Sequence, residues 1–101
     1  PTPPSAAVRI EGKDHAFFGF FEAVPGLVQV SHPVNKVVFV NAFSDRLATR
    51  LEGVTGDFRR QAYDQAWAPL SSGVVKHDGK GLVIDVSAPT RCFAVVLERI
   101  Q

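Results

Sequence analysis

The chain has 101 residues, of which 46% are hydrophobic and 21% charged, so it is sized for one domain with a real hydrophobic core. Its 11 Lys and Arg residues balance 10 Asp and Glu residues, and they do not gather into the basic face that attracts nucleic acid or anionic lipid. No apolar run approaches the ~20 residues of a membrane-spanning helix, so neither nucleic acid nor a membrane is expected as a partner.

The first residues have the composition of a linker. Pro1 to Ser5 are rich in Pro, Thr and Ser, as in extended interdomain connections. The chain contains no Met and opens with neither an initiator residue nor a signal peptide. We expect residues 1–5 to be a linker remnant and residues 6–101 to be one module of a larger protein.

Gly and Pro residues divide the rest of the chain into short runs rich in Val, Ile and Phe. This rhythm is typical of a β-sandwich or a β-barrel. The fold we expect is an antiparallel β-sandwich, jelly-roll or immunoglobulin-like, of about eight strands. Pro25 and Gly26 occupy the positions that a type II turn requires. In the first half of the chain, strands are expected at Ala7 to Glu11, His15 to Phe21, Leu27 to His32 and Lys36 to Phe43.

Four Phe residues bracket Gly19 in the second of these strands. Alternation directs two rings to each face of the sheet. One pair is expected to enter the core. The other pair, from the set Phe17, Phe18, Phe20 and Phe21, either forms an exposed binding surface, or is buried because the strand is covered on both sides, or is covered by a neighbouring domain.

The middle of the chain allows two interpretations. Residues 44–53 can form a helix capped by Ser44 and ended by Gly53, or a strand that buries Leu47, Thr49 and Leu51. Residues 57–67 can likewise form a helix capped by Asp57, or a strand whose open face carries Arg59, Gln61 and Tyr63. The β-rich surroundings favour strands in both segments.

Two elements are expected near the C-terminus. Val74 to His77 and Gly81 to Val86 flank Asp78-Gly79, a pair suited to the type I′ turn of a hairpin. Cys92 to Glu98 is apolar on both faces, which predicts a central strand. Cys92, the single cysteine, is expected to pack there as a small hydrophobic residue.

No group of residues has the spacing of a catalytic site. The acidic residues lie at turns or alternate along strands, which does not indicate the cleft that paired-carboxylate catalysis needs. His15, His32 and His77 lack short metal-ligand spacing, and a thiol in an apolar strand is inert. We therefore expect a protein that is not an enzyme.

Tyr63 and Trp67 are candidates for binding a sugar. The apolar face of a sugar ring packs on an aromatic ring, while its hydroxyls need polar groups around that ring. The alternative is that Trp67, the single Trp, anchors a loop against the core. Polar candidates that would hydrogen-bond the hydroxyls are Arg59, Gln61, Asp64, Gln65 and Asn41.

The last 60 or so residues resemble small β-sandwich domains at the ends of bacterial glycoside hydrolases. In that pattern a Gly ends one strand, an Arg/Tyr-rich strand follows, and an Ala-Pro turn leads to a final apolar strand. The residues that carry the resemblance are Phe43-Ser44-Asp45, Leu51-Glu52-Gly53, Gly56 to Asp64, Val86-Ser87-Ala88-Pro89 and Phe93 to Glu98. In size and build the whole chain is similar to carbohydrate-binding modules attached to endoglucanases, such as family 81.

The resemblance implies a secreted, bacterial, non-catalytic module that binds β-glucan chains and targets a covalently linked glycoside hydrolase to polysaccharide. The expected ligands are cello-oligosaccharides from cellulose, xyloglucan and mixed-linkage glucan. The alternatives are a structural appendage that packs on the catalytic barrel without binding sugar, and a protein-interaction module. No cofactor is required; β-sandwich sugar binders often hold a structural Ca²⁺, but no run of acidic ligands places one here.

Overall fold

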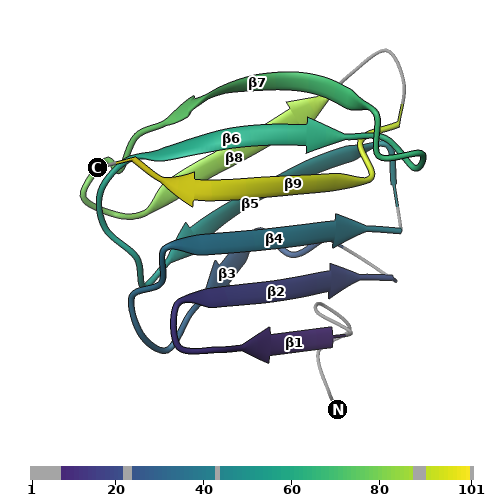
Figure 1. Ribbon diagram of the computed structural model, residues 1–101. Coiled ribbons are helices and arrows are strands. Elements are labelled where there is room, and N and C mark those ends of the chain that lie inside the picture. Colours follow the sequence, from purple (N-terminus) through teal and green to yellow (C-terminus); the bar gives the residue numbers. More distant parts are fainter. Residues whose placement is uncertain (1–7, 22–23, 43, 88–90, 101) are drawn as a thin grey trace.

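The computed structural model describes residues 8–21, 24–42, 44–87 and 91–100, which form β-strands and no helix (Figure 1). Accordingly, the described part of the chain has no helix that is long and apolar enough to cross a membrane. The strands are β1 (Val8–Glu11), β2 (His15–Phe20), β3 (Leu27–Gln29), β4 (Lys36–Asn41), β5 (Arg46–Glu52), β6 (Phe58–Tyr63), β7 (Pro69–Val75), β8 (Leu82–Ser87) and β9 (Ala94–Arg99). The expectation of an all-β protein is confirmed.

The strands form a large sheet and a small one. The large sheet has the order β1-β2-β4-β9-β6-β7, and the small sheet has the order β3-β5-β8. In Figure 1 the small sheet lies behind the large one. Buried residues of both sheets belong to one hydrophobic cluster, an arrangement compatible with the expected β-sandwich.

Both sheets are mixed, and this corrects the expectation of antiparallel pairing throughout. β2 runs parallel to β4, and β3 runs parallel to β5. The chain passes from β2 to β3 in the other sheet before it returns as β4, and it repeats this step from β3 through β4 to β5. A strand of the opposite sheet thus serves as the crossover that parallel neighbours require.

Alternating side chains build the core between the sheets. The inner face of β2 carries Phe18 and Phe20, whose ring centroids lie 5.6 and 5.9 Å from that of Phe39 on β4. The small sheet contributes Leu47, Leu51 and Ile84 among others, all at most 1% exposed. These residues sit at every second position, so each strand turns its other face away from the core.

The ambiguous middle of the chain consists of strands. In β5, Leu47, Thr49 and Leu51 are buried at alternate positions, and the i, i+4 spacing of the two Leu residues is also a multiple of the strand period. In β6, Phe58 and Ala62 are buried while Arg59 is exposed. Long-range pairing of β5 with β3 and β8, and of β6 with β7 and β9, outweighs the local helical signal.

Two expected turns are wrong. Asp78-Gly79 does not join a hairpin, because β7 pairs with β6 and β8 pairs with β5 in the other sheet. Gly79 has the positive φ of 87° that suits the turn, but the segment carries the chain between sheets. Gly26 is not among the glycines with positive φ, so Val24 to Leu27 does not form a type II turn.

The last strand is central, as expected. β9 lies between β4 and β6, with Val95 and Leu97 fully buried. Cys92 precedes the strand and is also fully buried, where burial raises the pKa of its thiol. The thiol therefore packs as a neutral, apolar group.

Candidate functional site

A tight loop between β6 and β7 holds Trp67. The backbone N–H of Asp64 donates to the carbonyl of Ala68 at 3.0 Å, and the N–H of Trp67 donates to the carbonyl of Asp64 at 3.0 Å. The Asp64 side chain reinforces the loop, because its Oδ1 accepts the N–H groups of Ala66 and Ala68 at 2.8 and 2.9 Å. The position of Trp67 is therefore fixed by the backbone.

Trp67 has an unusual backbone conformation. Its φ of 61° is the only positive value among the described residues other than Gly. The residue after a hairpin turn of this kind is usually Gly, because a side chain in the left-handed region costs about 1–2 kcal/mol. Trp67 is 53% exposed as a residue, so burial in the core does not explain the strain.

Three rings from two segments meet at this end of the large sheet. The ring of Trp67 lies 5.7 Å from that of Tyr63 at an angle of 54°, and 5.8 Å from that of Phe93 at 89°. Phe93 is held beside Tyr63, whose carbonyl accepts its backbone N–H at 2.8 Å. We call Tyr63, Trp67 and Phe93 the aromatic cluster. Phe93 was not predicted, because only the pairing of β6 with β9 brings it there.

A polar cavity adjoins the same loop. It has a volume of about 280 Å³ and is lined by Asp64, Gln65, Ala66 and Arg91. Arg91 donates to the carbonyl of Ser44 at 3.3 Å and to that of Asn41 at 3.5 Å, which fixes the guanidinium at the cavity wall. The side chain of Gln65 has no hydrogen bond within the described part of the chain and is exposed. Arg91 was missed by the sequence analysis, since 24 positions separate it from Trp67 in the chain.

The other polar candidates on β6 extend away from the cluster. Arg59, Gln61 and Tyr63 share the outer face of the strand, as predicted for a strand here. Gln61 uses its side-chain amide group to donate to the carbonyls of Ala62 and Ser71, both at 3.0 Å. Arg59 lies four residues before Tyr63, about 13 Å away along an extended strand. It can therefore contact only a ligand that extends along β6.

Asn41 does not join the aromatic cluster. It lies on β4, is fully buried, and its side chain donates to the carbonyls of Ser44 and Arg46 at 3.0 and 3.2 Å. Asn41 follows Phe39 by two positions in β4, so both side chains lie on the inner face of that strand. Asn41 therefore supports the loop that fixes Arg91 and has no surface at which a sugar hydroxyl can reach it.

A second exposed region lies on β1 and the end of β2. Ile10 is 56% exposed and Phe21 is 50% exposed, while Val8 and Phe17 are partly covered. Gly19 makes room for the ring of Phe21, since a Cβ at this glycine would lie 3.2 Å from it. We call Val8, Ile10, Phe17 and Phe21 the apolar patch. Of the four Phe residues around Gly19, Phe18 and Phe20 enter the core, Phe17 is partly buried and Phe21 is exposed.

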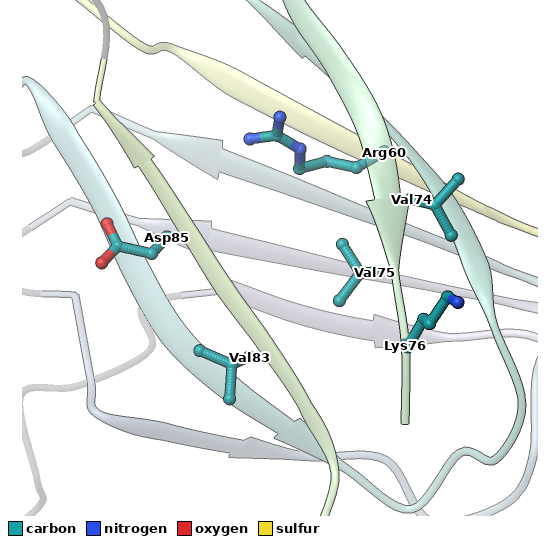
Figure 2. Close-up of a pocket in the computed structure, with 6 residues that line it drawn as sticks. All are labelled: Arg60, Val74, Val75, Lys76, Val83 and Asp85. Atoms are coloured by element: carbon teal, nitrogen blue, oxygen red, sulfur yellow. The ribbon is translucent and has the colours of Figure 1, made fainter. Parts of the chain in front are cut away.

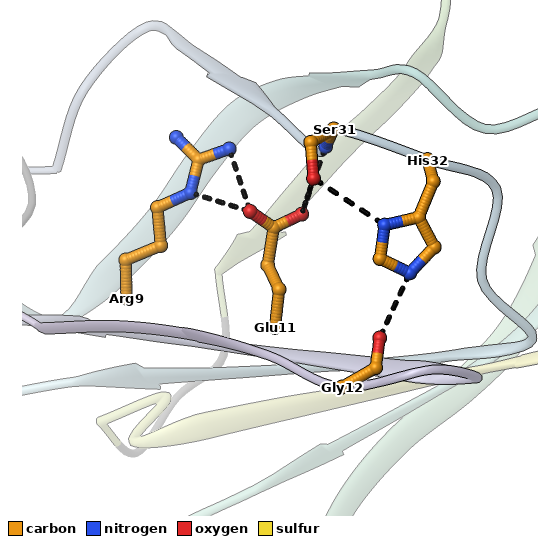
Figure 3. A network of polar contacts seen from close by, with 5 residues as sticks. All are labelled: Arg9, Glu11, Gly12, Ser31 and His32. Carbon is orange, nitrogen blue, oxygen red and sulfur yellow. Dashed lines mark hydrogen bonds and ion pairs between the residues drawn. The ribbon is translucent and has the colours of Figure 1, made fainter.

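The polar network in Figure 3 is structural. Glu11 accepts from Arg9 at 3.1 Å and from the backbone N–H and hydroxyl of Ser31 at 2.8 and 3.0 Å. His32 donates from Nε2 to the carbonyl of Gly12 at 2.8 Å. These bonds tie the β1–β2 turn to the segment after β3. They use the groups for internal contacts, so no acid–base pair for chemistry arises here.

The described residues contain no group of three or more His, Cys, Asp or Glu side chains that could hold a metal ion. On the small sheet, Arg46 and Asp85 form a two-pronged ion pair at 2.9 and 2.6 Å, which lowers the pKa of Asp85. A carboxylate engaged in this way is a structural partner and not a free acid.

No protein-family model, curated protein or solved structure matches this chain.

Proposed function

We propose that the chain is a non-catalytic carbohydrate-binding module whose ligand stacks on the aromatic cluster. The observation that carries this proposal is Trp67, an exposed residue held in a strained backbone conformation. Strain at an exposed aromatic residue is a feature of binding sites, because folding alone would favour Gly at that position. The backbone of the loop thus presents the ring to a ligand.

The neighbouring groups suit a neutral, hydroxyl-rich ligand. Tyr63 supplies a second ring face beside Trp67, and the adjoining cavity brings a carboxylate, an amide and a guanidinium within the same loop region. These groups donate and accept hydrogen bonds in several directions, as sugar hydroxyls require. β-Glucan chains, including cello-oligosaccharides, xyloglucan and mixed-linkage glucan, are the ligand class we propose.

Affinity is expected to be modest. The aromatic cluster lies at the surface and its adjoining cavity is small, so much of an extended ligand stays in water. Such sites give dissociation constants on the order of micromolar or weaker. A module of this strength gains from being joined to a catalytic domain, because linkage raises the effective concentration at the polysaccharide.

Affinity electrophoresis in gels that contain β-glucan tests the proposal. We expect the chain to be retarded by at least one of cellulose derivative, xyloglucan or mixed-linkage glucan, and Trp67→Ala to abolish the retardation. Phe21→Ala is a matched control, since it removes an equally exposed aromatic ring from the apolar patch. Its retardation should match that of the unaltered chain.

Absence of retardation in every glucan, together with an unchanged titration calorimetry baseline across a wider glycan panel, would contradict sugar binding. Loss of retardation in Phe21→Ala, with Trp67→Ala retarded as strongly as the unaltered chain, would move the site to the apolar patch. Retardation of the unaltered chain thus tests whether a glucan binds, and the two variants test where it binds.

The apolar patch favours a second candidate function. Ile10 and Phe21 expose apolar surface on the large sheet, as a domain that packs on a larger enzyme would. In this alternative the chain is a structural appendage of a glycoside hydrolase and binds no sugar. Silence toward all glycans, combined with a gain in solubility on Phe21→Ser or Ile10→Thr, supports the appendage.

A further inference from the structure

The free edge of β7 is a second surface with the features of a binding site. β7 is the last strand of the large sheet and pairs with β6 alone. Its seven residues include no charged side chain. Edge strands of monomeric proteins are commonly protected by charges or bulges within the strand, because their unpaired N–H and C=O groups accept another strand. β7 begins with Pro69 and its pairing with β6 is irregular at Leu70, but Ser71 to Val75 pair in regular register and carry no charge.

Arg60 directs an unpaired charge toward this edge. It lies on β6 opposite Leu97 and Gly73, and since Leu97 is fully buried, all three occupy the inner face. Arg60 is partly buried and forms no hydrogen bond or ion pair with another described residue. The positive charge of Arg60 acts on the buried Cys92 thiol, where it opposes the rise in the thiol pKa that burial causes. The guanidinium lines a cavity beside β7 and has no partner among the described residues, so a carboxylate of a ligand can pair with it there.

Gly73 leaves the path from Arg60 to the edge open. A Cβ at this glycine would lie 3.4 Å from Nη2 and 3.9 Å from Nε of Arg60, so the guanidinium lies directly over Gly73. Arg60 of β6 and Gly73 of β7 are paired across the two strands. A strand added to the free edge of β7 would place its own paired residue about 4.8 Å beyond Gly73. Arg60 can thus reach an acidic side chain on an added strand.

The space beside this edge is lined in a complementary way. A cavity of about 320 Å³ between β7 and β8 is bounded by Arg60, Val74, Val75, Lys76, Val83 and Asp85. Figure 2 shows the Arg60 side chain extending into the gap between the two strands, with Val83 and Asp85 on the opposite side. Asp85 is already neutralised by Arg46, and Lys76 has no ion pair within the described residues. The cavity is therefore positively charged, with Val side chains on both walls.

We propose that an extended peptide segment binds the free edge of β7 as an added strand, with an acidic residue opposite Gly73 that pairs with Arg60. Apolar residues two positions away on the same face of the peptide would lie beside Val75 and the Val side chains of the cavity. Backbone hydrogen bonds to β7 would supply affinity, and the Arg60 pair would fix the register. This surface is separate from the aromatic cluster, and the proposal does not depend on sugar binding.

A blocked nonapeptide of alternating Val and Thr, with Glu in place of the central Val, is the probe. Fluorescence polarisation with a labelled copy measures its affinity, and amide hydrogen exchange locates it. We expect binding together with slower exchange in β7. Replacing the Glu by Gln should weaken binding roughly tenfold, and moving the Glu by one position, which turns it to the opposite face, should weaken it as much.

Two variants of the chain test the same contact from the protein side. Arg60→Gln should remove the difference between the Glu and Gln peptides, whereas Arg59→Gln, its neighbour on the outer face, should preserve that difference. Gly73→Val keeps Arg60 but places a side chain where the guanidinium now lies over Gly73. The Glu peptide should therefore bind at least roughly tenfold more weakly. Peptides with alternate N-methyl groups provide a backbone control, since one of the two alternation patterns must block pairing.

Several outcomes would overturn the proposal. Equal binding of the Glu and Gln peptides, or an Arg60→Gln variant that still distinguishes them, would show that Arg60 forms no ion pair with the peptide. Slower exchange at β1 or at the aromatic cluster instead of β7 would relocate the binding. Competition by free glutarate at the affinity of the peptide would show a small-carboxylate site alone. Dimerisation of the chain that Gly73→Val abolishes would show that a second copy occupies the edge.

Discussion

The carbonyl of Asp64 accepts the backbone N–H of Trp67 at 3.0 Å, and this bond closes a turn in which Trp67 takes a φ of 61°. The Asp64 side chain holds the same loop through two further backbone N–H groups. The loop therefore holds Trp67 at a positive φ, which is sterically unfavourable for a residue with a side chain. Contacts with Tyr63 and Phe93 compensate for part of that cost.

Trp67→Gly should be more stable than Trp67→Ala by about 1 kcal/mol, because Gly adopts positive φ without steric conflict and Ala does not. Both variants lose the ring, so the comparison isolates the backbone. Urea unfolding followed by circular dichroism measures the difference. Both variants should lose retardation by β-glucan, whatever their stability.

Gln65, in the same loop but without positive φ, provides the control for this comparison. There the Ala variant should be as stable as the Gly variant or more so, since Gly has the greater conformational entropy when unfolded. Trp67→Ala as stable as Trp67→Gly would show that the loop relaxes and that Trp67 stores no strain.

Local sequence patterns predicted most strands but not their partners. Alternation, once a strand was assumed, placed Leu47, Thr49 and Leu51 of β5 on a buried face, because a strand's own residues carry that information. The partner of each strand depends on contacts far apart in the chain. Asp78-Gly79 illustrates this limit: a turn that suits a hairpin can equally carry the chain into the opposite sheet, where β8 pairs with β5.

The candidate site was predicted in part for the same reason. Tyr63 and Trp67 lie within one hairpin, so their proximity follows from sequence spacing. Phe93 and Arg91 reach the site only through the pairing of β6 with β9 and the bonds to Ser44 and Asn41. Asn41 was placed among the surface candidates for its chemistry alone, which does not reveal which face of a strand it occupies.

Thr49→Val should stabilise the protein by about 1 kcal/mol. Thr49 is 5% exposed on the inner face of β5, and its hydroxyl has no hydrogen-bond partner. Val has nearly the same shape and lacks the polar group whose desolvation is not compensated. Urea unfolding checks the gain. Thr55→Val, at an exposed loop position, should change little, and a destabilised Thr49→Val would mean that the hydroxyl finds a partner in solution.

Arg99→Lys should destabilise the protein by about 2 kcal/mol although it keeps the charge. Arg99 donates to Asn35 Oδ1 at 2.9 Å, to the carbonyl of Val34 at 3.0 Å and to that of Thr55, with its guanidinium 4.9 Å from the centroid of Phe58. A lysine amine cannot serve these divergent acceptors and stack on the ring. Thermal unfolding measures the loss. Arg59→Lys should leave the melting temperature unchanged, and a similar fall in both variants would contradict a specific role for the Arg99 fork.

Glu11→Gln should remove part of the acid sensitivity of the fold. The backbone N–H of Ser31, aided by the Ser31 hydroxyl and Arg9, lowers the pKa of Glu11 below its usual value of 4.5. A lowered pKa in the folded state means that the carboxylate stabilises the protein fully above that usual value, and that this stability is lost as the pH falls through the lowered one. Glu11→Gln should therefore be less stable than the unaltered chain at pH 7, by about 1 kcal/mol, and this difference should shrink as the pH falls below 4.5 and through the lowered pKa of Glu11. Ser31→Ala keeps the backbone N–H and should retain most of the pH dependence. Unfolding in urea across this pH range compares the three chains, and a gap between the unaltered chain and Glu11→Gln that does not change with pH would show that the carboxylate charge contributes nothing.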